Sequence, residues 1–203
     1  MLHENTPTLE TQRLILRKFT KDDLPAFWEI MKDKEVNTFL PWFPLETEQE
    51  ATDFLTNRFL TYYEKPFACR YAVCLKENNI PIGYVWLSDS ENHDFGYGLK
   101  KEFWRKGIIT EAAETVVEWL KNSGLPYITA THDVNNPRSG AVMKKLGMTY
   151  KYSYLEQWQP KNIPVTFRMY QRNFDENAQT YMEYWNKYQE HCRSKCHVII
   201  GLL

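Results

Sequence analysis

The sequence has 203 residues, of which 43% are hydrophobic and 25% are charged, and its formal net charge is -1. A chain of this length and composition is expected to form one globular domain with a substantial core. The near-zero net charge argues against a nucleic-acid-binding protein, because such proteins carry a basic surface. No apolar run approaches the roughly 20 residues that span a bilayer, and Met1–Glu10 lacks a hydrophobic signal region. A cytoplasmic location is therefore expected.

The first half of the chain predicts one strand, two helices and then three further strands. Arg13–Phe19 is predicted to be the first strand, and Thr20 can cap the helix that follows it. The segment Leu40–Pro44 cannot be regular helix, because two prolines bracket two large aromatic residues. The second helix is predicted from Thr47 to Tyr62. The three strands are predicted at Arg70–Leu75, Ile82–Ser88 and Asp94–Leu99.

The second half predicts an amphipathic helix followed by alternating strands and helices. Apolar residues recur at helical spacing between Ile109 and Leu120, and Gly124 and Pro126 end that helix. The later elements are predicted at Tyr127–His132 (strand), Pro137–Leu146 (helix), Tyr150–Trp158 and Val165–Arg172 (strands) and Asp175 to about Glu190 (helix). Antiparallel strands followed by a strand–helix–strand unit indicate an α+β fold with a mixed sheet.

The most informative stretch is Gly96–Ala112, where a strand ends, a short polar loop follows and an amphipathic helix begins. A helix start carries unpaired N–H groups and a partial positive charge. Gly107 lets the backbone approach a ligand closely, and Arg105 and Lys106 add positive charge. These features indicate a phosphate or pyrophosphate site. The alternative is a plain strand-to-helix turn with a solvated basic pair. The glycine patterns of nucleotide-triphosphate and dinucleotide sites are missing.

Residues Tyr97–Ala112 resemble the coenzyme-A motif of the Gcn5-related N-acetyltransferase (GNAT) superfamily. The resemblance is closest to the RimJ/RimL-like branch, which includes ribosomal-protein N-terminal acetyltransferases and spermidine acetyltransferases. The family pattern Arg/Gln-x-x-Gly-x-Gly/Ala falls on Trp104–Ile109, and Ile109 departs from Gly/Ala. Asn136–Ser139 and Lys145–Met148 resemble the downstream Asn-x-x-Ser…Lys-Leu-Gly-Phe segment. With a weaker match at the first strand, the resemblance covers residues 10 to 172.

The resemblance implies an α+β fold with a mixed, mostly antiparallel central sheet that is splayed between its fourth and fifth strands and flanked by helices. The acetyltransferase domain is expected at residues 1–173. Residues 174–203 are expected to form a C-terminal helix and tail that either pack on the domain or mediate contacts in a homodimer.

The same resemblance implies an enzyme that moves the acetyl group of acetyl-CoA to a primary amine by direct attack in a ternary complex. The acceptor is a protein N-terminus or a small-molecule amine, and no metal is involved. The alternative is a non-catalytic acyl-CoA-binding or regulatory module. The cofactor-binding residues implied by the family are Leu99, Lys100, Trp104, Arg105, Lys106, Gly107, Ile108, Ile109, Thr110, Asn136 and Ser139.

A thioester is already electrophilic, so the chemistry needs a neutral amine, a correct approach and stabilisation of the oxyanion. Most amines are protonated at pH 7, so a base must take a proton. The family implies a base at His93 or the adjacent Asp94, and places the main-chain N–H of Leu99 against the thioester. The other candidates for the base are His132, Asp133 and Glu156.

The acid that protonates the departing thiolate is a tyrosine in many family members. Met143 stands at that position here, so the resemblance points to Ser139 instead. Trp42 and Phe43 are expected to line the acceptor side. Tyr152, Tyr154 and Trp158 are candidates for the opposite wall.

Near the end of the chain, Cys192 and Cys196 lie beside His191 and His197. Both residue types ligate zinc, but one short cluster in a segment without other folding signals favours free thiols in a reducing compartment. No metal site is therefore expected.

Overall fold

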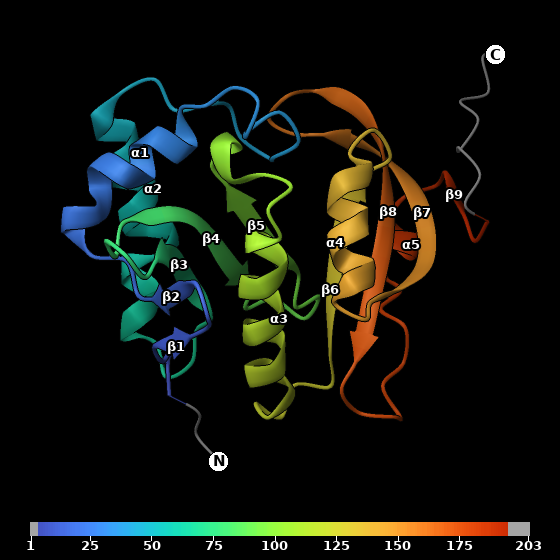
Figure 1. Ribbon diagram of the computed structural model, residues 1–203. Coiled ribbons are helices and arrows are strands. Elements are labelled where there is room, and N and C mark those ends of the chain that lie inside the picture. The colour runs from blue at the N-terminus through green and yellow to red at the C-terminus, as the bar shows by residue number, and fades with distance from the viewer. Residues whose placement is uncertain (1–3, 195–203) are drawn as a thin grey trace.

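Two antiparallel sheets lie side by side in the computed structural model, which describes residues 4–194 (Figure 1). Sheet A has the order β1 (Leu9–Glu10), β2 (Leu14–Arg17), β3 (Arg70–Leu75), β4 (Pro81–Leu87) and β5 (Phe95–Leu99). Sheet B has the order β6 (Tyr127–Asp133), β8 (Ile163–Asn173), β7 (Thr149–Trp158) and β9 (His191–Cys192).

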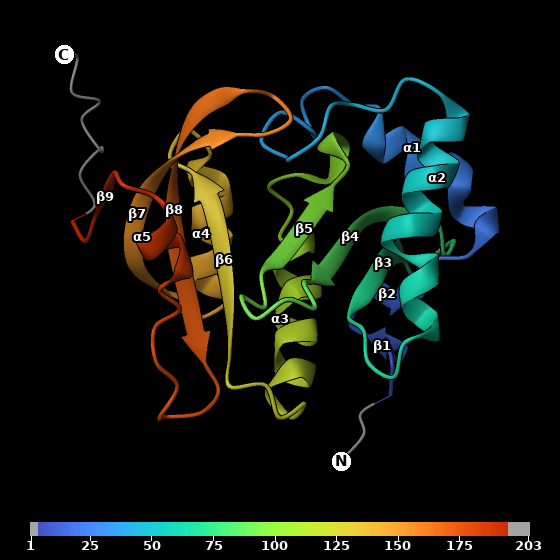
Figure 2. The ribbon, with the colours of Figure 1, turned by 180° about the vertical axis from the view of Figure 1, so that it is seen from behind.

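The two sheets meet between β5 and β6 and then diverge, as the view from behind shows (Figure 2). A single parallel bridge joins Asp94 to Thr129, where the Thr129 N–H donates to the carbonyl oxygen of His93 at 3.1 Å. The expected mixed sheet with a splay is confirmed. The diverging strands are β5 and β6, which are the expected fourth and fifth strands, because the two-residue β1 was not predicted.

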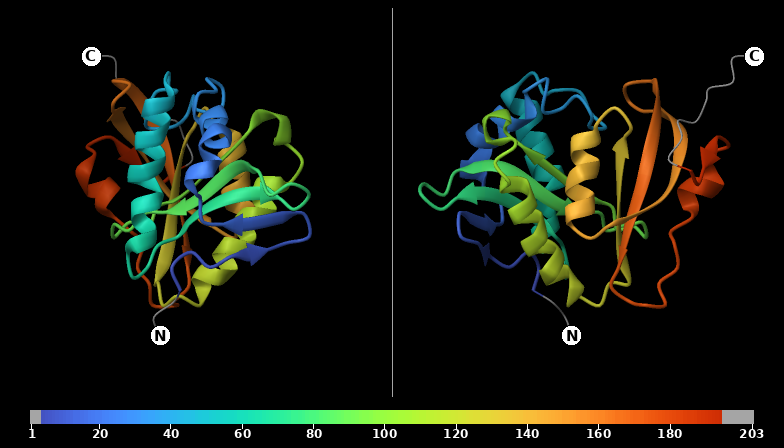
Figure 3. Two further views of the ribbon diagram at one scale, coloured as in Figure 1. Left: turned by 90° about the vertical axis from the view of Figure 1, so that its left-hand side faces the viewer. Right: turned by 45° about the vertical axis from the view of Figure 1, so that its right-hand side comes forward.

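Helices cover both faces of this frame (Figure 3). On one face of sheet A lie α1 (Leu24–Met31) and α2 (Glu48–Arg58), and on the other lie α3 (Ile108–Lys121) and, beside β6, α4 (Pro137–Lys145). Short 3-10 turns are η1 (Lys21–Asp23), η2 (Leu60–Glu64) and η3 (Lys101–Phe103). The helix predicted to reach Tyr62 is α-helical only to Arg58. None of the helices within residues 4–194 is both long and apolar enough to span a bilayer.

The amphipathic pattern of α3 is confirmed by its burial. Its apolar stripe faces the main core, which also takes residues from both sheets and from α4. The buried members on α3 are Ile108, Ala112, Ala113, Val116, Val117 and Leu120. A second core lies between sheet A and the pair α1 and α2. This arrangement fixes the start of α3 next to the end of β5.

The long C-terminal helix predicted from Asp175 to about Glu190 is wrong. Only α5 (Glu183–Lys187) is helical, and β9 adds to the edge of β7. Tyr181, Tyr184 and Tyr188 pack with their rings against the apolar face of β7 and β8, and these tertiary contacts outweigh the helical propensity of the polar segment. Cys196 and His197 lie outside the described residues.

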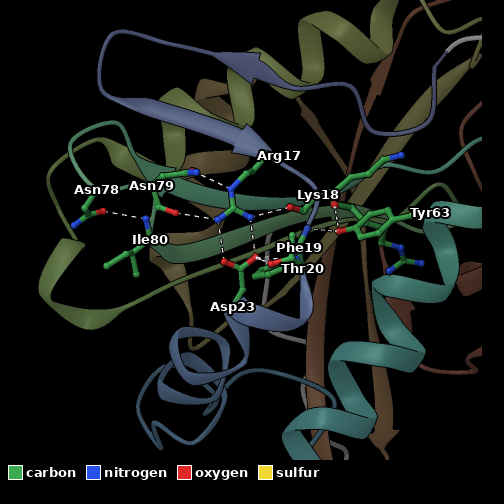
Figure 4. A network of polar contacts seen from close by, with 10 residues as sticks. Arg17, Lys18, Phe19, Thr20, Asp23, Tyr63, Asn78, Asn79 and Ile80 are labelled. Atoms are coloured by element: carbon green, nitrogen blue, oxygen red, sulfur yellow. Dashed lines mark hydrogen bonds and ion pairs between the residues drawn. The ribbon is translucent and has the colours of Figure 1, made fainter.

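A buried ion pair fixes the start of α1 against sheet A (Figure 4). The Arg17 guanidinium makes two hydrogen bonds to the Asp23 carboxylate, at 2.7 and 2.9 Å, and also donates to Asn79. Asp23 in turn accepts the Thr20 N–H at 2.8 Å, which completes the cap that the sequence predicts at Thr20. Although burial opposes ionisation, the bonds from Arg17 and Thr20 outweigh it and lower the pKa of Asp23.

Candidate active site

The loop between β5 and α3 leaves main-chain amides exposed at the start of α3. Gly107 stands at the helix N-cap with φ of 73°, and Arg105 also adopts a left-handed conformation, with φ of 61°. The first helical hydrogen bond is donated by the Glu111 N–H to the Gly107 carbonyl. The amides of residues 108–110 therefore precede the helical hydrogen bonds and are free to bind an anion.

Positive side chains surround the mouth of this loop. A pocket of about 330 Å³ is lined by Glu35, Lys101, Trp104, Arg105 and Arg138. Lys101 is paired with the Glu35 carboxylate, and Arg105 and Arg138 give the pocket a positive balance, so its lining fits a diphosphate. Lys101 and Arg138 were missed at the sequence level. Arg138 lies within the Asn-Pro-Arg-Ser motif that was identified. Its positive charge at the start of α4 could have indicated a phosphate-binding residue.

Arg13 holds the loop in place from the edge of sheet A. Its Nη1 atom donates to the Lys106 carbonyl at 2.9 Å, and its Nε atom donates to the Glu111 carboxylate at 2.7 Å. Burial opposes ionisation of Glu111, but the bonds from Thr11 and Arg13 outweigh it and lower its pKa. The start of α3 is therefore fixed by ionic contacts to the chain segment before β2, which sequence reasoning also missed.

Other residues predicted to bind the cofactor lie outside the lining of this pocket. Lys100 lines a separate pocket with Glu29 and Asp33 on the α1 side. Ile109 packs against the edge of the main core, and the Lys106 ammonium lies over the ring of Phe103. The departure from Gly/Ala at Ile109 is thus accommodated by the core.

The register of β5 turns part of its backbone toward the splay. The Lys100 N–H donates to Ile82, and the Ser88 N–H donates to Asp94, so the even-numbered residues of β5 bond to β4. Because bonding direction alternates along an antiparallel strand, the N–H group of Leu99 points toward β6 instead. The Leu99 carbonyl accepts a hydrogen bond from the Trp104 indole at 2.8 Å. The predicted position of the Leu99 N–H is compatible with this geometry.

Asp94 lies where β5 and β6 begin to separate. Its Oδ1 atom is buried and has no hydrogen-bond partner among residues 4–194, whereas the main-chain N–H of Thr131 bonds to its carboxyl group. Burial raises the pKa of Asp94 to about 7, against the weaker opposing effect of that hydrogen bond. Tyr154 and Tyr184 lie near enough for the Asp94 charge to raise the pKa of both hydroxyls, in addition to the larger effect of burial.

His93 occupies a different position from its neighbour. It has φ of 45° at the end of the β4–β5 connection, and its ring centroid lies 5.5 Å from that of Tyr127. Burial lowers the pKa of His93. Both His93 and Asp94 are therefore compatible with a base by their pKa, but the buried carboxyl group at the splay is Asp94.

Ser139 lies on the opposite side of β5, in the first turn of α4. The Asn136 side chain accepts the Ser139 N–H at 3.4 Å, so Asn136 is the predicted N-cap. The Ser139 hydroxyl lies 3.0 Å from the Tyr97 hydroxyl. Met143 is 1% exposed in the main core and does not line the splay. Sequence reasoning missed Tyr97 as the partner of Ser139.

The other candidates for the base each make contacts elsewhere in the fold. His132 is buried beneath α4, where a Cβ atom on Gly140 would lie 2.5 Å from its Nε2 atom. Asp133 is also buried, and its carboxylate accepts the Asn135 N–H. Glu156 is half-buried on β7 and bonds to the Tyr188 hydroxyl.

The two aromatic residues of the predicted acceptor side differ in exposure, since Trp42 is partly buried and Phe43 is exposed. The Trp42 indole donates to the Asn37 side chain at 2.8 Å, and its ring contacts Trp86 edge-on with centroids 6.3 Å apart. Phe43 is 58% exposed. On the other side, Tyr154 is buried and stacks with Tyr184 and Tyr188 in the aromatic cluster between sheet B and the C-terminal segment.

The matches to known proteins agree with this geometry. A family model described as an acetyltransferase (GNAT) domain matches residues 13–149. The chain belongs to this family. The GNAT enzyme is thus an N-acetyltransferase.

Relatives of this GNAT enzyme carry the same activity in their names. YnaD of Bacillus subtilis, an uncharacterized N-acetyltransferase, is 28% identical over 144 residues, which are 69% of this chain and 81% of YnaD. A GNAT-family acetyltransferase structure from Bacillus anthracis has a TM-score of 0.72 and 23% identity, covering 83% of this chain and 99% of that one.

The structure of RimL, a ribosomal L7/L12 alpha-N-protein acetyltransferase in complex with coenzyme A, superposes with a TM-score of 0.74 and 18% identity. It covers 84% of this chain and 100% of RimL. The predicted likeness to ribosomal-protein acetyltransferases is confirmed at the level of the fold. Within residues 4–194 of the GNAT enzyme, no cluster of three or more potential metal ligands occurs.

Proposed function

We propose that this GNAT enzyme transfers the acetyl group of acetyl-CoA to a primary amine by direct attack in a ternary complex. The observation that supports it most is the placement of two kinds of proton-transfer group around one splay. The Asp94 carboxyl group lies at the start of the splay, and Ser139 with Tyr97 lies on the α4 side of β5. A base and an acid so separated suit a reaction with an amine on one side and a thiolate leaving on the other.

The cofactor is held by its diphosphate in this proposal. The main-chain amides of residues 105–110 would bind the phosphate oxygens, and Lys101, Arg105 and Arg138 would neutralise their charge. Acetyl-CoA supplies an electrophilic thioester. The Leu99 N–H, turned toward β6, would donate to the carbonyl oxygen as negative charge develops there.

Asp94 is the proposed general base. A carboxyl group with a pKa of about 7 is ionised in half of the molecules at neutral pH and can accept the proton of an ammonium group or of an intervening water. The Thr131 amide orients the carboxylate. The neighbouring tyrosines exclude water from the carboxylate, and this burial keeps the pKa of Asp94 near 7.

Ser139 is the proposed donor to the thiolate. Its hydroxyl group can pass a proton to the sulfur and regain one from water. The Tyr97 hydroxyl donates to the Ser139 main-chain oxygen at 2.9 Å and lies 3.0 Å from the Ser139 hydroxyl, so it holds Ser139 in place. Burial raises the pKa of Tyr97, so the phenol stays protonated and acts as a donor throughout the neutral range. This pair replaces the family tyrosine whose position is taken by Met143.

The acceptor class is a primary amine, either at a protein N-terminus or on a small molecule. Trp42 and Phe43 would line the acceptor path on the α1 and α2 side, and the tyrosines of sheet B would form the facing wall. We also propose that residues 1–173 form the acetyltransferase domain and that the C-terminal segment belongs to it structurally, since Tyr184 bonds to Asn92 at 2.7 Å next to Asp94.

A thiol-release assay with acetyl-CoA tests the proposal, using peptides with free N-termini, polyamines and aminoglycosides as acceptors. Amine-dependent release is expected, and it should fall in Asp94→Asn but not in Glu91→Gln, an exposed carboxylate of the same connection. Binding of acetyl-CoA by calorimetry without release by any amine would instead favour the non-catalytic acyl-CoA-binding module.

A further inference from the structure

A lysine at the tip of the β7–β8 hairpin ties the two halves of the molecule together. The Lys161 ammonium donates to the main-chain oxygens of Asn37 and Thr38, at 2.9 and 2.7 Å, across a sequence separation of 124 and 123 residues. Asn37 and Thr38 belong to the connection between α1 and α2 beside sheet A, whereas Lys161 belongs to sheet B. The two loops approach each other at the end of the molecule where the splay is open (Figure 2).

The sheet A end of this bridge is a built structure. Asn37 is fully buried, and its amide nitrogen donates to the carbonyls of Ile30 and Met31 at 2.9 and 3.0 Å. Its amide oxygen accepts the Trp42 indole N–H at 2.8 Å. The carbonyls that Lys161 contacts are therefore held by the end of α1 and are coupled directly to the position of Trp42.

The sheet B end is ordered as well. The side-chain amides of Gln157 and Gln159 both donate to the Asn162 side chain, at 3.0 and 3.2 Å, and Asn162 has φ of 53°. The Lys161 ammonium also lies 5.4 Å from the centroid of the Trp158 ring. Burial lowers the pKa of Lys161. Two contacts to carbonyl oxygens and one to a ring face suit a charged ammonium group.

The loop that Lys161 holds packs on the α1 and α2 side of sheet A through Trp42. A Cβ atom on Gly96 would lie 1.7 Å from the Trp86 indole nitrogen, so Trp86 covers this strand on the α1 and α2 side. Side chains alternate along a strand, and Gly96 shares its face with Asp94. Trp42 meets Trp86 edge-on. The loop that Lys161 holds is thus connected through Trp42 and Trp86 to the face of β5 that carries Asp94.

We propose that Lys161 sets the width of the acceptor entrance, so that the enzyme selects primary amines carried on slender, unbranched arms. This inference rests on the proposed function. With the bridge formed, the two loops enclose the approach to the splay from both sides. An amine on a linear chain passes beneath the bridge, whereas one on a wide ring requires both hydrogen bonds to open.

The test compares n-butylamine with cyclohexylmethylamine, which have the same charge and the same reacting group but different widths. The variants are Lys161→Met, which keeps the length of the side chain and removes its donors, and Lys34→Met, which changes an exposed lysine of the same loop. We expect the preference for n-butylamine in kcat/KM to fall by about tenfold in Lys161→Met, with the KM for acetyl-CoA unchanged. Lys34→Met should keep the wild-type preference.

An unchanged preference in Lys161→Met, with turnover intact, overturns this inference and leaves the proposed function standing. Amide hydrogen exchange gives a second readout that needs no turnover. Residues 37–42 and 158–163 should exchange faster in Lys161→Met than in the wild type or Lys34→Met, and equal exchange would also overturn the inference. Absence of transfer by the wild type to any amine overturns the proposed function itself, and the acceptor selection with it.

Discussion

Replacing Asp94 by Asn should remove activity and at the same time stabilise the protein. Asn keeps an oxygen that can accept the Thr131 amide, but it cannot take a proton from the amine. Loss of a general base lowers rates by roughly 10² to 10⁴. We expect kcat/KM for the amine to fall by at least about 100-fold, with the KM for acetyl-CoA unchanged.

The stability effect follows from the raised pKa of Asp94, about 7 in the folded protein against 3.8 for the free side chain. The folded state binds the proton more tightly than the unfolded state. The free energy of unfolding therefore falls as pH rises from about 4 to about 7, and it stays low above that. A tenfold change in proton affinity corresponds to about 1.4 kcal/mol. Keeping the carboxylate ionised at pH 8 thus costs the fold up to about 4 kcal/mol.

Asn does not titrate, so the advantage of Asp94→Asn should grow by about 2 to 3 kcal/mol between pH 5 and pH 8. Urea denaturation at the two pH values measures this difference, and Glu91→Gln is the control. The wild-type kcat/KM should rise with pH through an apparent pKa near 7. Near-normal turnover by Asp94→Asn, or an equal stability difference at both pH values, would refute the assignment of Asp94 as a buried base.

Three further variants test other parts of the site. Arg138→Met should raise the KM for acetyl-CoA by about five- to tenfold, with less dependence on salt and an unchanged kcat, because it removes one cation from the diphosphate pocket. Tyr97→Phe should lower kcat by about tenfold through loss of the bond to Ser139. If the two residues act as a pair, the double variant Tyr97→Phe/Ser139→Ala should have a kcat only slightly lower than that of Ser139→Ala alone. Asp23→Asn should destabilise the fold by about 2 to 4 kcal/mol at pH 7 by leaving Arg17 without its carboxylate partner. Since the pKa of Asp23 is lowered, this difference should shrink as pH falls below about 4, and a difference as large at pH 2 as at pH 7 would contradict the ion-pair explanation.

Local patterns were sufficient to predict most of the central fold. The apolar stripe of α3, the Asn136 cap of α4 and the strands that flank them all depend on nearby residues, so the sequence carries their signal directly. The two-residue β1 is too short for any periodic pattern. The C-terminal segment was mispredicted because contacts with sheet B outweigh its helical composition. Those contacts join residues about 30 positions apart, so no local pattern shows them.

The candidate site was predictable only where it follows a contiguous motif. The loop Trp104–Thr110 and the segment Asn136–Ser139 were both identified from their order and spacing. The pairing of Ser139 with Tyr97 and the bridge from Lys161 to Asn37 join residues far apart in sequence, and no local pattern encodes them. The proposal of Asp94 over the adjacent His93 likewise depends on burial, which no local pattern shows.

The account depends on the cofactor lying with its diphosphate at the start of α3 and its thiol in the splay. A crystal structure with bound coenzyme A measures this directly. The account predicts phosphate oxygens within hydrogen-bond distance of the main-chain N–H groups of residues 105–110, and the sulfur between β5 and β6 near the Leu99 N–H. A diphosphate bound elsewhere, or a thiol outside the splay, would contradict it.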